Sequence, residues 1–197
     1  MILCLLQVIL VRVGDVVSSE DGEKIVKLII LIFQSLKKVS QHGLLAYGGL
    51  CQGLKERVNV NDFGKYILWA LQGDDDDCAR VACGLVSDIA TALGEQVNIY
   101  LTSFVPPLLQ MLSAVDKDRQ TKLAALMSLG DLAINAPKSY CQSYLSDTMQ
   151  ILHHAGELSL KREEYKDDQD VLDYLSDLRT SILNCYSTIT SGAKDSG

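Results

Sequence analysis

The chain has 197 residues, of which 48% are hydrophobic and 22% are charged, a balance typical of a folded protein rather than a disordered segment. Its formal net charge of −7 argues against direct binding to nucleic acid, because phosphate contacts need a basic surface. A basic peptide or protein is a better match for an acidic chain.

The chain begins with an apolar run over residues 1–13, MILCLLQVILVRV. This run is too short to span a bilayer and has no basic stretch before it, so we expect neither membrane insertion nor a signal peptide. We interpret it as the second helix of a repeat whose first helix is missing, which would make the chain a fragment of a longer solenoid. Gly14 and Gly22 bound the loop expected next.

The rest of the chain predicts helix pairs, because it is rich in Leu, Ala and Ile and holds only three prolines. The expected helices cover 23–38 and 41–57, then 61–72 and 76–93, then 96–114 and 118–135, and finally 137–155 and 168–191. The last pair is joined by a long charged turn over 156–168, where a solenoid tolerates insertions.

The second helices share a pattern that sets the length of the repeat. Leu50, Ile89 and Leu132 fall at equivalent places, at intervals of 39 and 43 residues. Such intervals are typical of HEAT or armadillo repeats and exceed the 34 residues of a tetratricopeptide repeat. Ile189 takes the same place in the last pair, 57 residues after Leu132, with the surplus in the long turn.

These observations predict one all-α fold, an α-α superhelix of the HEAT-repeat solenoid class, over residues 1–197. It would hold about four full repeats and one partial repeat. The partial repeat covers 1–13, and the full repeats cover about 23–57, 61–93, 96–135 and 137–191.

The sequence offers no pattern for catalysis, a cofactor or a metal. Its six cysteines form no CxxC pair and are expected to be reduced thiols in a cytosolic or nuclear protein. His153 and His154 are adjacent and point to different sides of a helix, without a third ligand at metal spacing. Nucleophile elbows, phosphate-binding loops and dinucleotide-binding glycines are absent as well, so we expect no enzyme.

Three segments carry a resemblance to a known family. They are Ala82–Leu93 (ACGLVSDIATAL), Leu126–Ile134 (LMSLGDLAI) and Val171–Asp195 (VLDYLSDLRTSILNCYSTITSGAKD). In order and spacing they resemble the middle-to-C-terminal HEAT repeats of the importin-β (karyopherin-β) nuclear import receptors. The resemblance implies binding to basic import signals or the importin-α adaptor, and to Phe-Gly nucleoporins. It also implies Ran-GTP binding through other parts of the receptor, and residence in the cytoplasm, the nucleus and the nuclear pore.

The resemblance points to two groups of candidate residues. Asp88 and Asp131 lie on second helices, which in importin-β form the wall that holds basic signals, and Glu56 is a weaker candidate for the same role. A slot for nucleoporin Phe rings is expected among side chains of first helices, namely Tyr66, Trp69, Phe104 and Leu108. Each has a plainer alternative: a solvated helix face for the carboxylates and core packing for the aromatic and leucine side chains.

A second function stays open on the residues alone. A HEAT scaffold of another class, such as a phosphatase regulatory subunit or a coat adaptor, would share the repeat length and the small residues of the second helices.

Overall fold

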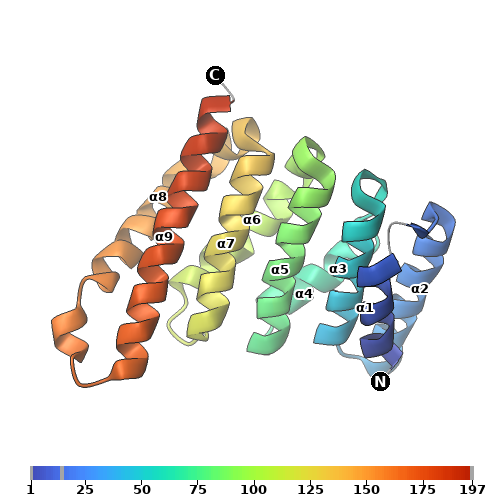
Figure 1. Ribbon diagram of the computed structural model, residues 1–197, viewed down its shortest axis with the longest axis horizontal. Coiled ribbons are helices and arrows are strands. Elements are labelled where there is room, and N and C mark those ends of the chain that lie inside the picture. Colours follow the sequence, from blue (N-terminus) through green and yellow to red (C-terminus); the bar gives the residue numbers. More distant parts are fainter. Residues whose placement is uncertain (1, 14–15, 196–197) are drawn as a thin grey trace. The chain divides into compact units, whose positions relative to one another are not determined.

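The computed structural model describes residues 2–13 and 16–195, and this part of the chain folds into helices without a strand. The α-helices are α1 Ile2–Val13, α2 Ser19–Leu36, α3 Gln41–Leu54, α4 Gly64–Gln72, α5 Asp76–Leu93, α6 Leu101–Ser113, α7 Arg119–Asn135, α8 Pro137–Ser159 and α9 Gln169–Asp195 (Figure 1). Short 3₁₀ helices occur at η2 Lys55–Arg57, η3 Gly94–Tyr100 and η4 Arg162–Tyr165. The predicted all-α architecture of paired helices is confirmed.

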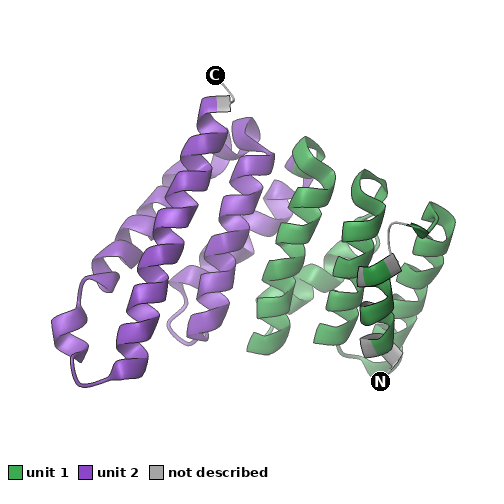
Figure 2. Cartoon of the chain, in the orientation of Figure 1, with its two compact units in different colours: residues 1–97 green, residues 98–197 purple. Residues whose placement is uncertain are grey.

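The chain divides into two compact units, residues 1–97 and residues 98–197 (Figure 2). The division falls after residue 97, inside η3 and two residues into the predicted repeat 96–135. Unit 1 holds α1 and two helix pairs, and unit 2 holds two helix pairs. Each unit has its own buried residues and is described by itself below.

Unit 1 is a double layer of helices. Helices α1, α3 and α5 pack side by side in one layer, while α2 packs on α3 and α4 packs on α5 (Figure 1). Thus α1 takes the position expected of a second helix. Fully buried aliphatic side chains such as Leu50 and Ile89 fill the interior, where Tyr47 also stacks on Phe63 with ring centroids 4.0 Å apart.

Unit 2 repeats this arrangement with two helix pairs. Helix α7 packs on α9, α6 packs on α8, and each first helix packs on its own second helix. Leu129 and Leu132 of α7 are fully buried. The interior also holds a hydrogen bond of 2.9 Å between the hydroxyls of Tyr140 and Thr148, which satisfies both buried polar groups.

Side-chain caps fix where the second helices begin. The Ser40 side chain accepts a hydrogen bond from Gly43 N, Asp75 from Cys78 N, Asp118 from Thr121 N, and Asp168 from Val171 N. In every case the cap is three residues ahead of its donor, the geometry of a helix N-cap. The three carboxylates also oppose the positive end of the helix dipole.

Asp75 has a second role, because it links two consecutive turns. Lys38, in the turn between α2 and α3, places its Nζ 3.1 Å from the Asp75 carboxylate. The Cys78 thiol adds a hydrogen bond to the Val39 carbonyl. The turn of one repeat is therefore tied to the turn of the next by a lysine and an aspartate, while Arg80 pairs with Asp77 inside α5.

Several helix boundaries differ from prediction: α3 ends at Leu54 rather than 57, α4 begins at Gly64 rather than 61, and α9 continues to Asp195 rather than 191. Helix α2 starts at Ser19, not at 23, because the Ser18 side chain caps it by accepting from Asp21 N. The segment expected to be one helix over 96–114 is split into η3 and α6. Helix α8 continues to Ser159 through Gly156, past the expected end at 155.

We expect replacement of Asp75 by alanine to lower the free energy of unfolding by about 1 kcal/mol, because it removes the α5 cap. The hydrogen bond from the Cys78 N–H is the main cause that lowers the pKa of Asp75, and the hydrogen bond from Lys38 is the second. A lowered folded-state pKa gives stability that is present above the unfolded pKa and is lost as pH falls through the folded value. Urea unfolding of D75A and wild type should therefore differ at pH 7, and the difference should shrink as the pH falls below 3.8, the ordinary pKa of this carboxyl group, and through its lower folded-state pKa. The control is D74A, which removes the exposed carboxylate next to the cap; an equal loss in D74A would contradict the cap.

Two glycines should respond in opposite ways to alanine. A Cβ at Gly43 would overlap ring atoms of the buried Phe33, whereas a Cβ at Gly84 meets nothing within 4 Å. We expect G43A to cost about 1–3 kcal/mol by overpacking. G84A, in the exposed face of α5, should gain up to about 1 kcal/mol from helix propensity. Urea midpoints of the two variants measure this contrast, and similar shifts in both would refute it.

Candidate protein-binding sites

Asp88 lies on α5 with its carboxylate turned toward α3. It is half-buried, and the side-chain amide of Gln52 donates a hydrogen bond of 3.3 Å to its Oδ1. Gly48 of α3 makes room for it, since a Cβ at Gly48 would lie only 2.8 Å from Asp88 Oδ2. Burial raises the pKa of the Cys51 thiol well above its ordinary value, and the negative charge of Asp88 adds to this.

Asp131 has a comparable setting on α7. It is half-buried and shares a shallow cavity of about 160 Å³ with Ser181, Asn184 and Thr188 of α9. Burial raises the pKa of the Cys185 thiol to about 12, again with a contribution from the nearby carboxylate, here Asp131. Each aspartate therefore lies beside a neighbouring second helix of its own unit. That location leaves the carboxylate partly open to a cation.

Glu56 is exposed in η2, between Lys55 and Arg57. Two adjacent cations reduce the negative potential that this carboxylate presents, so it is a weaker site for a basic partner than Asp88.

The four candidate slot residues differ in exposure. Trp69 is 56% exposed on α4, while Tyr66 of the same helix is buried. The Tyr66 ring packs against Phe33 and Phe63, and its hydroxyl accepts a hydrogen bond from Gln34. In this unit Tyr66 therefore contributes to the core, and Trp69 offers a ring to solvent.

Phe104 and Leu108 belong to α6 of unit 2 and are 1% and 0% exposed. The Phe104 ring lies 6.0 Å from that of Tyr100, measured between centroids. Their burial favours core packing. Apolar residues at helical spacing indicate a helix. This spacing does not distinguish an exposed apolar residue such as Trp69 from its buried neighbours.

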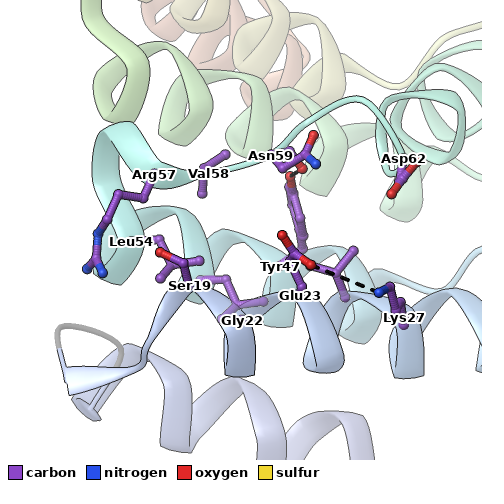
Figure 3. A pocket seen from close by; sticks show the side chains of 12 residues that line it. Ser19, Gly22, Glu23, Lys27, Tyr47, Leu54, Arg57, Val58, Asn59 and Asp62 are labelled. Carbon is purple, nitrogen blue, oxygen red and sulfur yellow. Dashed lines mark hydrogen bonds and ion pairs between the residues drawn. The ribbon is translucent and has the colours of Figure 1, made fainter.

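A small cavity of about 120 Å³ lies in unit 1, beside the start of α2 (Figure 3). Glu23 and Lys27 form an ion pair at 4.0 Å on one side, and Arg57 and Asp62 line other parts. The Tyr47 hydroxyl donates a hydrogen bond of 2.8 Å to the Asn59 carbonyl. Sequence reasoning missed this cavity, because it forms where the residues after α3 pass over α2.

A larger cavity of about 570 Å³ lies in unit 2 among α6, α7, α8 and α9. Its walls are mainly apolar, with Lys122, His154 and Tyr174 as its ionisable side chains. The long turn over 156–168 was the nearest signal in the sequence, since it marks where the last repeat departs from the others. That signal gave no indication of a cavity.

The residues described in the structure contain no group of three or more His, Cys, Asp or Glu side chains placed to hold a metal ion. No helix in the same part of the chain is long and apolar enough to cross a membrane.

Comparison with known proteins identifies the family. The family model described as "Importin subunit beta-1-like, TPR repeats" matches residues 1–197. The chain belongs to this importin subunit beta-1-like family. The model's description names TPR repeats, whereas the intervals of 39 and 43 residues between the second helices of this chain have HEAT spacing.

Curated relatives agree with this membership. Importin subunit beta-1 of Schizosaccharomyces pombe is 30% identical over 186 residues, which cover 91% of this chain and 21% of that protein. Importin subunit beta-1 of Arabidopsis thaliana is 27% identical over 199 residues, covering 97% of this chain and 22% of the relative. The chain thus spans about a fifth of the length of these relatives.

Solved structures share the fold. A crystal structure of importin beta superposes with a TM-score of 0.84 at 22% identity, covering 96% of this chain and 22% of that one. The Kap95 chain of a Kap95:Nup1 complex gives 0.75 at 24% identity, covering 90% and 21%. The HEAT-repeat solenoid class is therefore confirmed. The family match over residues 1–197, rather than the shared fold, favours the importin subunit beta-1-like family over a phosphatase regulatory subunit or a coat adaptor.

Proposed function

We propose that this chain is part of a non-catalytic nuclear transport receptor that carries protein cargo into the nucleus. Its partners would be basic import signals, including that of the importin-α adaptor, and Phe-Gly nucleoporins. The observation that carries the proposal is the match to the importin subunit beta-1-like family over the whole chain. Residence in the cytoplasm, the nucleus and the nuclear pore follows from that role.

Half-buried carboxylates on the second helices support the binding of basic segments. Asp88 and Asp131 are partly shielded from water, where a contact with Lys or Arg is stronger than on a fully solvated surface. The net charge of −7 would draw a basic segment toward the protein from a distance.

Contacts of importin-β proteins with nucleoporins and Ran supply the second support. One related structure is a Kap95:Nup1 complex, and another concerns Kap95p and RanGDP, at 24% and 23% identity to this chain. In this chain the exposed Trp69 is the best-placed of the four slot residues to receive a Phe ring. We assign Ran-GTP binding to other parts of the longer receptor.

Removing either carboxylate should weaken binding of a basic probe. For a fluorescent peptide of eight alternating Lys and Arg residues, we expect D88N and D131N each to raise Kd about two- to fivefold, because one charge-assisted contact is lost. The wild-type Kd should also rise with added salt.

The matched control for this experiment is D147N, which removes the same charge from the exposed face of α8, a first helix. If D147N raises Kd as much as D88N does, the peptide responds only to the net charge of the protein, and Asp88 and Asp131 are not its specific contacts. If the basic peptide does not bind wild-type protein whose circular dichroism shows that it is folded, this part of the receptor does not bind basic segments.

The single tryptophan provides a direct readout of the second partner. A peptide with repeated Phe-Gly pairs should change the fluorescence of Trp69, and by peptide anisotropy W69A should bind about fivefold more weakly. The control is L183A on α9, a second helix, where Leu183 is 61% exposed. Equal affinities of wild type and W69A would exclude Trp69 from the nucleoporin site.

A further inference from the structure

The long turn between α8 and α9 carries a four-residue pattern that occurs once in the sequence. Leu160, Lys161 and Glu163 are spaced as a large aliphatic residue, a lysine, any residue and a glutamate. No other lysine of the sequence has both a large aliphatic residue directly before it and a glutamate two places after it. The predicted insertion therefore contains a specific chemical pattern as well as extra length.

The pattern is open to solvent. All residues from 160 to 170 are exposed, and Leu160 is 70% exposed although its side chain is apolar. Lys161 makes no ion pair and no side-chain hydrogen bond with another residue that the structure describes, so its ammonium is accessible to an approaching enzyme. Burial of the leucine by such an enzyme would be favourable, because it removes apolar surface from water.

Both ends of the turn are held, while its middle is not packed. Arg179 of α9 donates a hydrogen bond of 3.2 Å to the Ser159 carbonyl, and Asp168 caps the start of α9. Between these two points lies η4, a 3₁₀ helix of four residues with no buried side chain. So short a 3₁₀ helix opens at small cost, which allows the pattern to extend along the surface of a partner.

Such a pattern matches what an enzyme needs to recognise one particular lysine. Lysine is the residue to which ubiquitin and ubiquitin-like proteins are attached. The conjugating enzyme for the small ubiquitin-like modifier reads its acceptor directly: the aliphatic residue packs beside the reactive cysteine, and the glutamate pairs with polar and basic groups. These two contacts hold the intervening lysine at the reacting bond.

Further negative charge follows the pattern along the chain. Four exposed carboxylates come after Glu163, on Glu164, Asp167, Asp168 and Asp170. They would attract a basic surface on the conjugating enzyme and raise the rate of encounter.

We propose that Lys161 is an acceptor for a small ubiquitin-like modifier. The neutral Lys161 amine attacks the thioester carbonyl that joins the C-terminal glycine of the modifier to the cysteine of its conjugating enzyme. A C–N isopeptide bond forms, the C–S bond breaks, and the cysteine leaves as a thiol that takes up a proton from the amine. Because the acceptor lies outside the packed helices, attachment leaves the interior of unit 2 unchanged. The proposal does not depend on the transport function.

The test is a reconstituted reaction with purified activating enzyme, conjugating enzyme, modifier and ATP. Wild-type protein should gain one modifier, seen as a shifted band on a denaturing gel and located at Lys161 by mass spectrometry. K161R should lose this band, whereas the control K166R, in the same exposed turn, should keep it.

A second pair of variants tests the recognition of the pattern. E163Q should lower the initial rate of conjugation about tenfold, because a charge-assisted contact with the enzyme is lost. The matched control E157Q, which removes an exposed carboxylate from the last turn of α8, should react like wild type. Circular dichroism of each variant verifies the fold.

Three results would overturn the proposal. They are an unmodified wild-type protein in a reaction that modifies a standard substrate, a band that survives in K161R, and an E163Q variant that reacts as fast as wild type. K161R retains the positive charge and leaves Asp88, Asp131 and Trp69 in place, so it should bind the basic and Phe-Gly peptides like wild type. Failure here is therefore distinguishable from failure of the transport role.

Discussion

The structure depends on the close lateral packing of second helices within each unit. Helix α3 can lie against α5 only because Gly48 leaves space for the Asp88 carboxylate, and α7 lies against α9 because Gly130 leaves space for Thr188. A glycine in a helix has an intrinsic cost of about 1 kcal/mol relative to alanine. Burial of Leu50, Ile89 and their equivalents along the same contact more than offsets it. Each first helix then lies beside its own second helix, because chain connectivity joins the two.

The same contact determines where charge can be used. A carboxylate on the packing face would be buried without a partner at a cost of several kcal/mol, and one on the far face would be fully solvated. Asp88 and Asp131 occupy the intermediate position, at the edge of the contact with a neighbouring second helix. Their position follows from the register of the repeat, since each directly precedes a fully buried residue, Ile89 or Leu132.

The fold could be predicted from the sequence because the same helix-pair pattern recurs several times along the chain. Equivalent residues at Leu50, Ile89 and Leu132 determined the helix pairs. The periodicity of the sequence does not reveal how exposed each apolar residue is. The prediction of a nucleoporin slot therefore grouped the exposed Trp69 with Phe104 and Leu108, which are buried. The cavity of unit 2 was out of reach too, because it results from a difference in length between two helices that contact each other only in space.

The buried cysteines have a practical consequence for following the motions of this protein. Burial raises the pKa of the Cys83 and Cys185 thiols to about 12, and that of Cys51 is raised as well, so all three are almost wholly protonated at neutral pH. The thiolate is the nucleophile that attacks an alkylating reagent, so each of these buried cysteines becomes reactive only when its helix opens. The alkylation rates of Cys51 and Cys83 would then report how often α3 and α5 open, and the rate of Cys185 would report the opening of α9. Each unit therefore contains a native thiol that reports its own opening.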